Sequence, residues 1–159
     1  MQKINFQNLP NTTTPVNATN LNDLQDNVED AISDIFESGN WTPTLANANV
    51  TYDQQYGLYF KIGNLVFVTW RLEGTIDSVT SPAYAFINGL PYNASLQQAG
   101  SLFNYANCFN DNTTPRLVRV VNNQIGIQDG ISGGTTISSW ETEHGTFYLG
   151  GSATYLTGN

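Results

Sequence analysis

Apolar residues between positions 20 and 38 recur every three or four residues. This spacing places five of them on one side of a helix: Leu21, Leu24, Val28, Ala31 and Ile35. Thr19 or Asn20 can cap the start of the helix, and Gly39 with Asn40 ends it. The pattern therefore predicts a helix over residues 20–38 with one apolar seam.

A helix of about 17 residues is marginal in water unless its seam is buried. Six acidic residues and no basic residue fall between Asp23 and Glu37, which adds repulsion to that cost. We expect a parallel bundle of several copies, a short coiled coil, to bury the seam. The alternative is that the helix lies across its own domain, because two heptads are short for a coiled coil.

After Gly39 the apolar period becomes two, as in a β-strand. Gly63-Asn64 forms a two-residue hairpin turn, and pairing across it sets Ile62 opposite Leu65 and Phe60 opposite Phe67. The other face of this hairpin carries Val66, Val68 and Trp70. Because both faces are apolar, we expect one to meet the core and the other to be free for a neighbouring subunit.

A second hairpin turns at Asn122-Asn123. Its pairing gathers Val118, Val120, Ile125 and Ile127 on one face and places Arg119, Gln124 and Gln128 on the other. Further short strands are expected at 41–45, 84–88, 102–109, 135–140 and 146–156. Many short strands without a later helix predict a mainly β domain over residues 39–159, an antiparallel β-sandwich that is jelly-roll-like.

Residues 1–19 contain Pro10 and Pro15 and few apolar side chains, so they are expected to form an extended peptide. Ile4, Phe6 and Leu9 are its candidate anchors to another protein. The spacing of Ile4 and Phe6 suits a strand added to a neighbouring sheet edge. The alternative is a disordered terminus.

The amino-acid composition limits the classes of partner that the chain is expected to bind. The chain has 159 residues, a formal net charge of −8 and five basic residues, so nucleic acid is not expected as a partner. No signal peptide or long apolar run opens the chain, and we expect a protein that is made without export and does not enter a membrane. The single cysteine, Cys108, is expected to be a buried small apolar residue.

Candidate chemistry is sparse. Glu141 and Glu143 stand two residues apart beside the only histidine, His144. Acids so placed in a loop are usually solvated surface, and one histidine does not make a metal cluster. We therefore expect a non-enzymatic protein with no catalytic residue, no metal and no cofactor.

Binding is better supported than catalysis. Polar loops rich in Asn, Gln, Ser and Tyr make adaptable hydrogen bonds. Trp140, Tyr105 and Tyr84 are the candidates to stack on sugar rings. For each of them the alternative is core packing.

Several segments resemble small structural proteins of bacteriophages. The opening residues 5–10 and 14–22 run into the acidic helix as in such proteins. Residues 39–45 and 57–68 resemble the start of the C-terminal domains of phage tail-fibre and receptor-binding proteins, and 88–92 resemble their Gly-Leu-Pro-aromatic turn. Residues 150–157 are similar to their closing strand.

The resemblance implies a virion protein that is made in the cytoplasm of a bacterial host and is a homotrimer around its N-terminal helix. It also implies that the N-terminal peptide joins other virion proteins. A tail-fibre tip, a head fibre and a spike all fit the short helix. The β-domain would then bind a host-surface saccharide; a connector that makes only protein contacts within the particle is the alternative.

Overall fold

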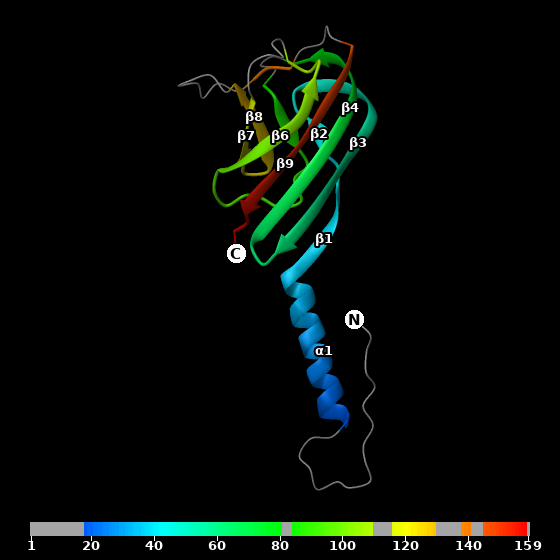
Figure 1. The fold of residues 1–159 in the computed structure, drawn as a ribbon, viewed down its shortest axis with the longest axis vertical. Coiled ribbons are helices and arrows are strands. Elements are labelled where there is room, and N and C mark those ends of the chain that lie inside the picture. The colour runs from blue at the N-terminus through cyan, green and yellow to red at the C-terminus, as the bar shows by residue number, and fades with distance from the viewer. Residues whose placement is uncertain (1–17, 81–83, 110–115, 130–137, 141–144, 159) are drawn as a thin grey trace. The chain divides into compact units, whose positions relative to one another are not determined.

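The computed structural model describes residues 18–80, 84–109, 116–129, 138–140 and 145–158. Within them the chain is mainly β, with one helix and antiparallel strand pairs (Figure 1). The elements follow the chain in this order: α1 (Ala18–Ile35), β1 (Phe36–Trp41), β2 (Thr44–Leu45), β3 (Ala48–Ile62), β4 (Leu65–Val79), β5 (Phe86–Asn88), β6 (Gln98–Ala106), β7 (Arg116–Val121), β8 (Gln124–Asp129) and β9 (Thr146–Leu156).

The helix prediction is correct in kind and shifted in position. α1 begins at Ala18, inside the segment expected to be extended, and ends at Ile35, three residues before the expected limit. Phe36–Trp41 forms β1 instead of the last helical turn. Ser38 and Gly39 are poor helix formers, and pairing of β1 with β3 gives their backbone groups other partners.

The chain divides into two compact units between Glu37 and Ser38. In the second unit, hydrogen bonds run through all the described strands as one sheet, in the order β1-β3-β4-β9-β6-β7-β8-β5-β2. Its two edges, β1 and β2, are separated in the chain only by Thr42 and Pro43. The sheet must therefore fold back on itself, which gives a sandwich-like arrangement from a single continuous sheet.

Both predicted hairpins are confirmed in register. Ile62 pairs with Leu65 and Phe60 with Phe67 across the first turn. Val118 pairs with Ile127 and Val120 with Ile125 across the second, and all four are buried. Gln128, expected on the wet face, is buried as well.

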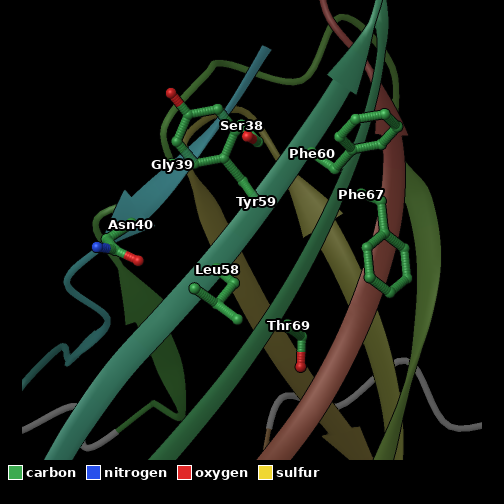
Figure 2. Close-up of a pocket in the computed structure, with 8 residues that line it drawn as sticks. All are labelled: Ser38, Gly39, Asn40, Leu58, Tyr59, Phe60, Phe67 and Thr69. Carbon is green, nitrogen blue, oxygen red and sulfur yellow. The ribbon is translucent and has the colours of Figure 1, made fainter. Parts of the chain in front are cut away.

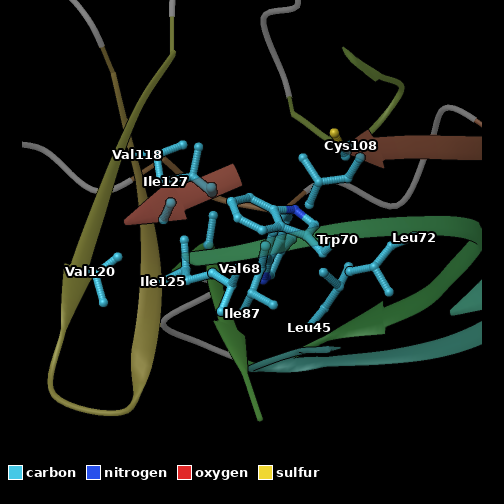
Figure 3. Packing of buried hydrophobic residues seen from close by; sticks show 14 of the residues in the cluster. Leu45, Val68, Trp70, Leu72, Ile87, Cys108, Val118, Val120, Ile125 and Ile127 are labelled. Carbon is cyan, nitrogen blue, oxygen red and sulfur yellow. The ribbon is translucent and has the colours of Figure 1, made fainter. Parts of the chain in front are cut away.

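The core lies between the two arms of the folded sheet (Figure 3). One arm contributes residues of β4 and β9, such as Val68 and Leu149, and the other contributes residues of β5, β7 and β8, such as Ile87 and Ile125. Cys108 is buried within this cluster, as expected from the sequence.

Trp70 sits on β4 between two glycines on the neighbouring strands. It pairs with Gly57 of β3 on one side and with Gly151 of β9 on the other. A Cβ atom on Gly151 would overlap the Trp70 indole, and one on Gly57 would overlap the Trp41 indole. The two indoles meet edge to face, with ring centroids 6.5 Å apart.

Trp41 joins β1 to this arrangement. Its Nε1 donates to the carbonyl oxygens of Leu58 in β3 and Thr69 in β4, each at 3.2 Å. A further hydrogen bond ties β2 to β3: the Leu45 N–H donates to the Tyr52 hydroxyl oxygen at 2.7 Å. β1 and β2, the two edge strands of the sheet, are therefore both attached to the β3–β4 hairpin by side-chain hydrogen bonds.

We expect Gly57→Ala and Gly151→Ala each to lower the free energy of unfolding by about 1–3 kcal/mol, because an added methyl group overpacks the indoles. Urea denaturation of the purified variants measures this. Gly158→Ala is the control, since a Cβ there meets no atom within 4 Å, and it should stay within about 0.5 kcal/mol of the parent. Parent-like stability of both test variants would contradict the role of the glycines.

Candidate functional site

The long β3–β4 hairpin and β9 present an apolar surface on the side away from the core. We call it the outer face and define it by six residues: Leu58, Phe60, Ile62, Leu65, Phe67 and Leu156. Register places them in adjoining rows. Ile62, Leu65 and Leu156 form one row across the three strands, and Phe60, Phe67 and Thr154 form the next.

These side chains are exposed although they are large and apolar. Their exposed fractions run from 39% at Leu156 to 51% at Leu58. Their neighbours in sequence, such as Val66 and Val68, are fully buried. The predicted division of the hairpin into a core face and a free apolar face is therefore confirmed.

A shallow groove of about 430 Å³ runs between β1 and the outer face (Figure 2). Ser38, Gly39 and Asn40 line it from β1, and Leu58, Phe60 and Phe67 are among the residues that line it from β3 and β4. Figure 2 shows the rings of Phe60 and Phe67 side by side at one end and Leu58 with Thr69 at the other. The groove is lined mainly by carbon atoms, so its surface suits an apolar side chain better than a charged ligand.

The outer face becomes polar farther along β4. Arg71 donates from Nε to Glu73 Oε1, and the two form an ion pair. The hydrogen bond to Glu73 raises the pKa of Arg71. Tyr56 and Tyr148 lie on the strands beside this pair, in the rows of Arg71 and Glu73, and both are exposed.

A second polar cluster lies at the end of β7 and β8. Arg116 Nη1 and Ser138 Oγ both donate to Asp129 Oδ1, each at 2.6 Å. The Arg116 guanidinium also lies over the Phe109 ring, 4.7 Å from its centroid. Because Arg116 is buried and its charge is matched by Asp129, we interpret this cluster as a structural tie between the strands and the 138–140 segment.

The three aromatic candidates for sugar stacking fall in different environments. Trp140 is 1% exposed, its ring stacks on Phe109, and its Nε1 donates to Ala46 O at 2.8 Å. Tyr105 is half-buried and packs edge to face on Phe109. For both residues the structure matches the alternative, packing at the core.

Tyr84 is the candidate that presents its ring to solvent. It is 45% exposed and meets Phe86 edge to face, with ring centroids 6.5 Å apart. Asn47 Nδ2 donates to its carbonyl oxygen at 3.3 Å. The three candidates therefore do not form one site, although Tyr84 remains available for stacking.

The predicted seam of α1 is exposed in the single chain. Leu24 is 60% exposed, Val28 47% and Ile35 46%; Ala31 is exposed too, and Leu21 is partly exposed. Ile32 adds a further exposed apolar side chain. The seam has the composition of a contact surface and no cover within the described chain.

Some sequence candidates lie outside the described residues. These are the anchor residues Ile4, Phe6 and Leu9, together with Glu141, Glu143 and His144. Among the residues that the structure does describe, no group of three or more His, Cys, Asp or Glu side chains is placed to hold a metal ion. No helix in the described part of the chain is long and apolar enough to cross a membrane.

Sequence reasoning found the apolar second face of the hairpin but missed the groove beside it. The groove depends on β1 lying next to β3, and β1 was expected to be partly helical. The alternation of Glu37, Gly39 and Trp41 is too short a signal to identify a strand.

No protein family, no curated protein and no solved structure matches this chain.

Cys108 is placed as a core residue and not as a nucleophile. It is fully buried, and desolvation raises the pKa of its thiol to about 12. The thiolate is the reactive form, so the native thiol should react with a disulfide reagent at pH 8 far more slowly than the urea-unfolded chain. A native rate equal to the unfolded rate would contradict the buried position.

The same thiol gives a dependence on pH. An unfolded thiol ionises near 9.0 and the native one near 12, so only the unfolded chain loses this proton between those values. The free energy of unfolding should therefore fall as the pH rises from 9 to 12. Urea denaturation across this range should show a smaller fall for Cys108→Ala than for the parent.

Proposed function

We propose that this chain is a structural protein of a bacteriophage particle, a tail-fibre tip, head fibre or spike that assembles as a homotrimer. The observation that carries the proposal is the exposed apolar seam of α1, placed directly before a mainly β domain. The ordered resemblance of segments along the chain to phage fibre proteins supplies the setting. Residues 1–19 would hold the trimer to other virion proteins.

The seam supports self-association on physical grounds. An isolated helix of 18 residues is marginal in water, and burying large apolar side chains contributes roughly 1.5–3 kcal/mol each. The acidic residues of α1 repel one another between copies, but they leave the seam itself apolar. Asp23, Asp26, Glu29 and Asp30 fall outside the seam positions, so a short coiled coil of parallel helices keeps them in solvent.

The partner of the β-domain is the second part of the proposal. A host-surface saccharide would be recognised by exposed aromatic rings among polar side chains, and Tyr84 offers such a ring. Three copies of a weak site would bind together with useful avidity. The connector alternative is favoured by a different observation, because the outer face is apolar and suits protein contacts better than sugar.

Replacing Val28 and Ile35 together by Asp should convert the trimer into a monomer, because two charges would enter the seam. Light scattering should return three times 17.4 kDa for the parent and 17.4 kDa for the variant. Ser33→Asp is the control: it adds a charge to the same helix outside the seam and should leave the trimer intact. A parent that is monomeric at micromolar concentration would sink the proposed assembly.

Removing residues 1–17 should leave the trimer folded but prevent its incorporation into particles. Electron microscopy of purified particles labelled for this protein measures incorporation and also shows whether the label lies on the head or the tail. Normal labelling of particles that carry the shortened protein would refute the anchor.

A glycan array probed with the full-length trimer separates the adhesin from the connector. Tyr84→Ala should weaken saccharide binding by roughly tenfold, as expected for the loss of one stacking ring. Leu117→Ala removes a comparably exposed apolar side chain on β7 and should leave binding unchanged. Absence of any glycan signal would favour the connector.

A further inference from the structure

The outer face is a large apolar surface for a single chain to leave in contact with water. Its six exposed side chains form a continuous patch on the order of 500 Å², at the upper end of what monomeric proteins show. This is also a large share of the roughly 800 Å² that each partner contributes to a stable interface. A patch of this size is often a contact surface.

We propose that the outer face docks on a second copy of this chain, as a second interface beside the one formed by α1. The inference rests on the proposed function for the assembly and adds to it the part of the β-domain that the assembly buries. Two observations select a second copy over other occupants: the charge of the face and its place in the chain.

The charge of the face permits contact between copies. The chain carries a net charge of −8, so two copies repel one another over most of their surfaces. The six residues of the outer face are uncharged. Lys61, the nearest base in sequence, belongs to the opposite face of the hairpin, where its Nζ lies 5.2 Å from the centroid of the Tyr92 ring. An anionic membrane surface would need unpaired basic side chains, and the base farther along this side of β4, Arg71, is paired with Glu73.

The place of the face in the chain favours the same occupant. α1 ends at Ile35, β1 begins at the next residue, and β1 pairs with β3, which carries Leu58, Phe60 and Ile62. Copies joined through α1 therefore hold their outer faces at high effective concentration. A contact too weak to form between separate chains becomes favourable once the helices have assembled.

The groove gives this contact a centre. Binding energy at protein interfaces concentrates where a large side chain enters a desolvated pocket. Leu58, Phe60 and Phe67 line the shallow groove beside β1, about 430 Å³ in volume, which a covering chain would desolvate. An apolar side chain of the second copy would fill it, while the surrounding apolar rows exclude water.

Photo-crosslinking of the full-length protein tests the contact. Incorporating p-benzoylphenylalanine in place of Phe67 should give, on irradiation, a covalent adduct of twice the chain mass. Mass spectrometry should place the second chain's crosslinked residue within its β-domain. The same photoreactive residue in place of Leu117, which is 54% exposed on β7, is the matched control and should give little interchain adduct.

Substitution gives an independent measurement. Phe60→Asp with Phe67→Asp should raise the dissociation constant of the oligomer at least tenfold in analytical ultracentrifugation, and Leu117→Asp should leave it unchanged. Far-ultraviolet circular dichroism verifies that each variant is folded, which is expected because the altered side chains are exposed.

The outcomes separate this inference from the proposed function. Parent-like assembly of the Phe60→Asp, Phe67→Asp variant, or an oligomer without a position-67 adduct, overturns the outer-face contact and leaves the role of α1 standing. A position-67 adduct in a Val28→Asp, Ile35→Asp protein that is still oligomeric supports the contact and refutes the role of α1. Crosslinking of position 67 to phosphatidylcholine vesicles in preference to a second chain also overturns the contact.

Discussion

The fold depends on the fit of two indole rings against glycine backbone in the long hairpin. Trp70 needs the bare backbone of Gly151 on one side, and Trp41 needs that of Gly57. Trp41 also hydrogen-bonds two strands at once, through Leu58 O and Thr69 O. Because Trp41 lies in the segment that supplies both edges of the sheet, this packing decides where the sheet closes on itself.

The closure has a consequence for the outside of the molecule. With Val66, Val68 and Trp70 directed into the core, the alternation of a strand forces the next residues outward. Those residues are Leu65 and Phe67, and their cross-strand partners Ile62 and Phe60 are also large and apolar. The register that buries one set of apolar side chains in the core therefore places a second apolar set on the outside. β1, held by Trp41, borders this surface and makes the groove.

Two apolar surfaces thus remain exposed in one chain, the seam of α1 and the outer face. Each has the composition of a contact surface, and α1 leads directly into β1, the strand that pairs with β3 of the outer face. The acidic residues that give the protein its charge lie outside both. The proposed assembly of several copies would account for both surfaces, because it would bury them.

The sequence by itself determined the helix seam, both hairpin registers, the apolar second face and the burial of Cys108. Each of these follows from local periodicity or a two-residue turn, signals that a few neighbouring residues contain. Only the tertiary structure decided that Phe36–Trp41 is a strand, that Trp140 is a core residue and that a groove adjoins the outer face. These depend on contacts between residues distant in sequence, such as Trp140 Nε1 with Ala46 O, which no local pattern encodes.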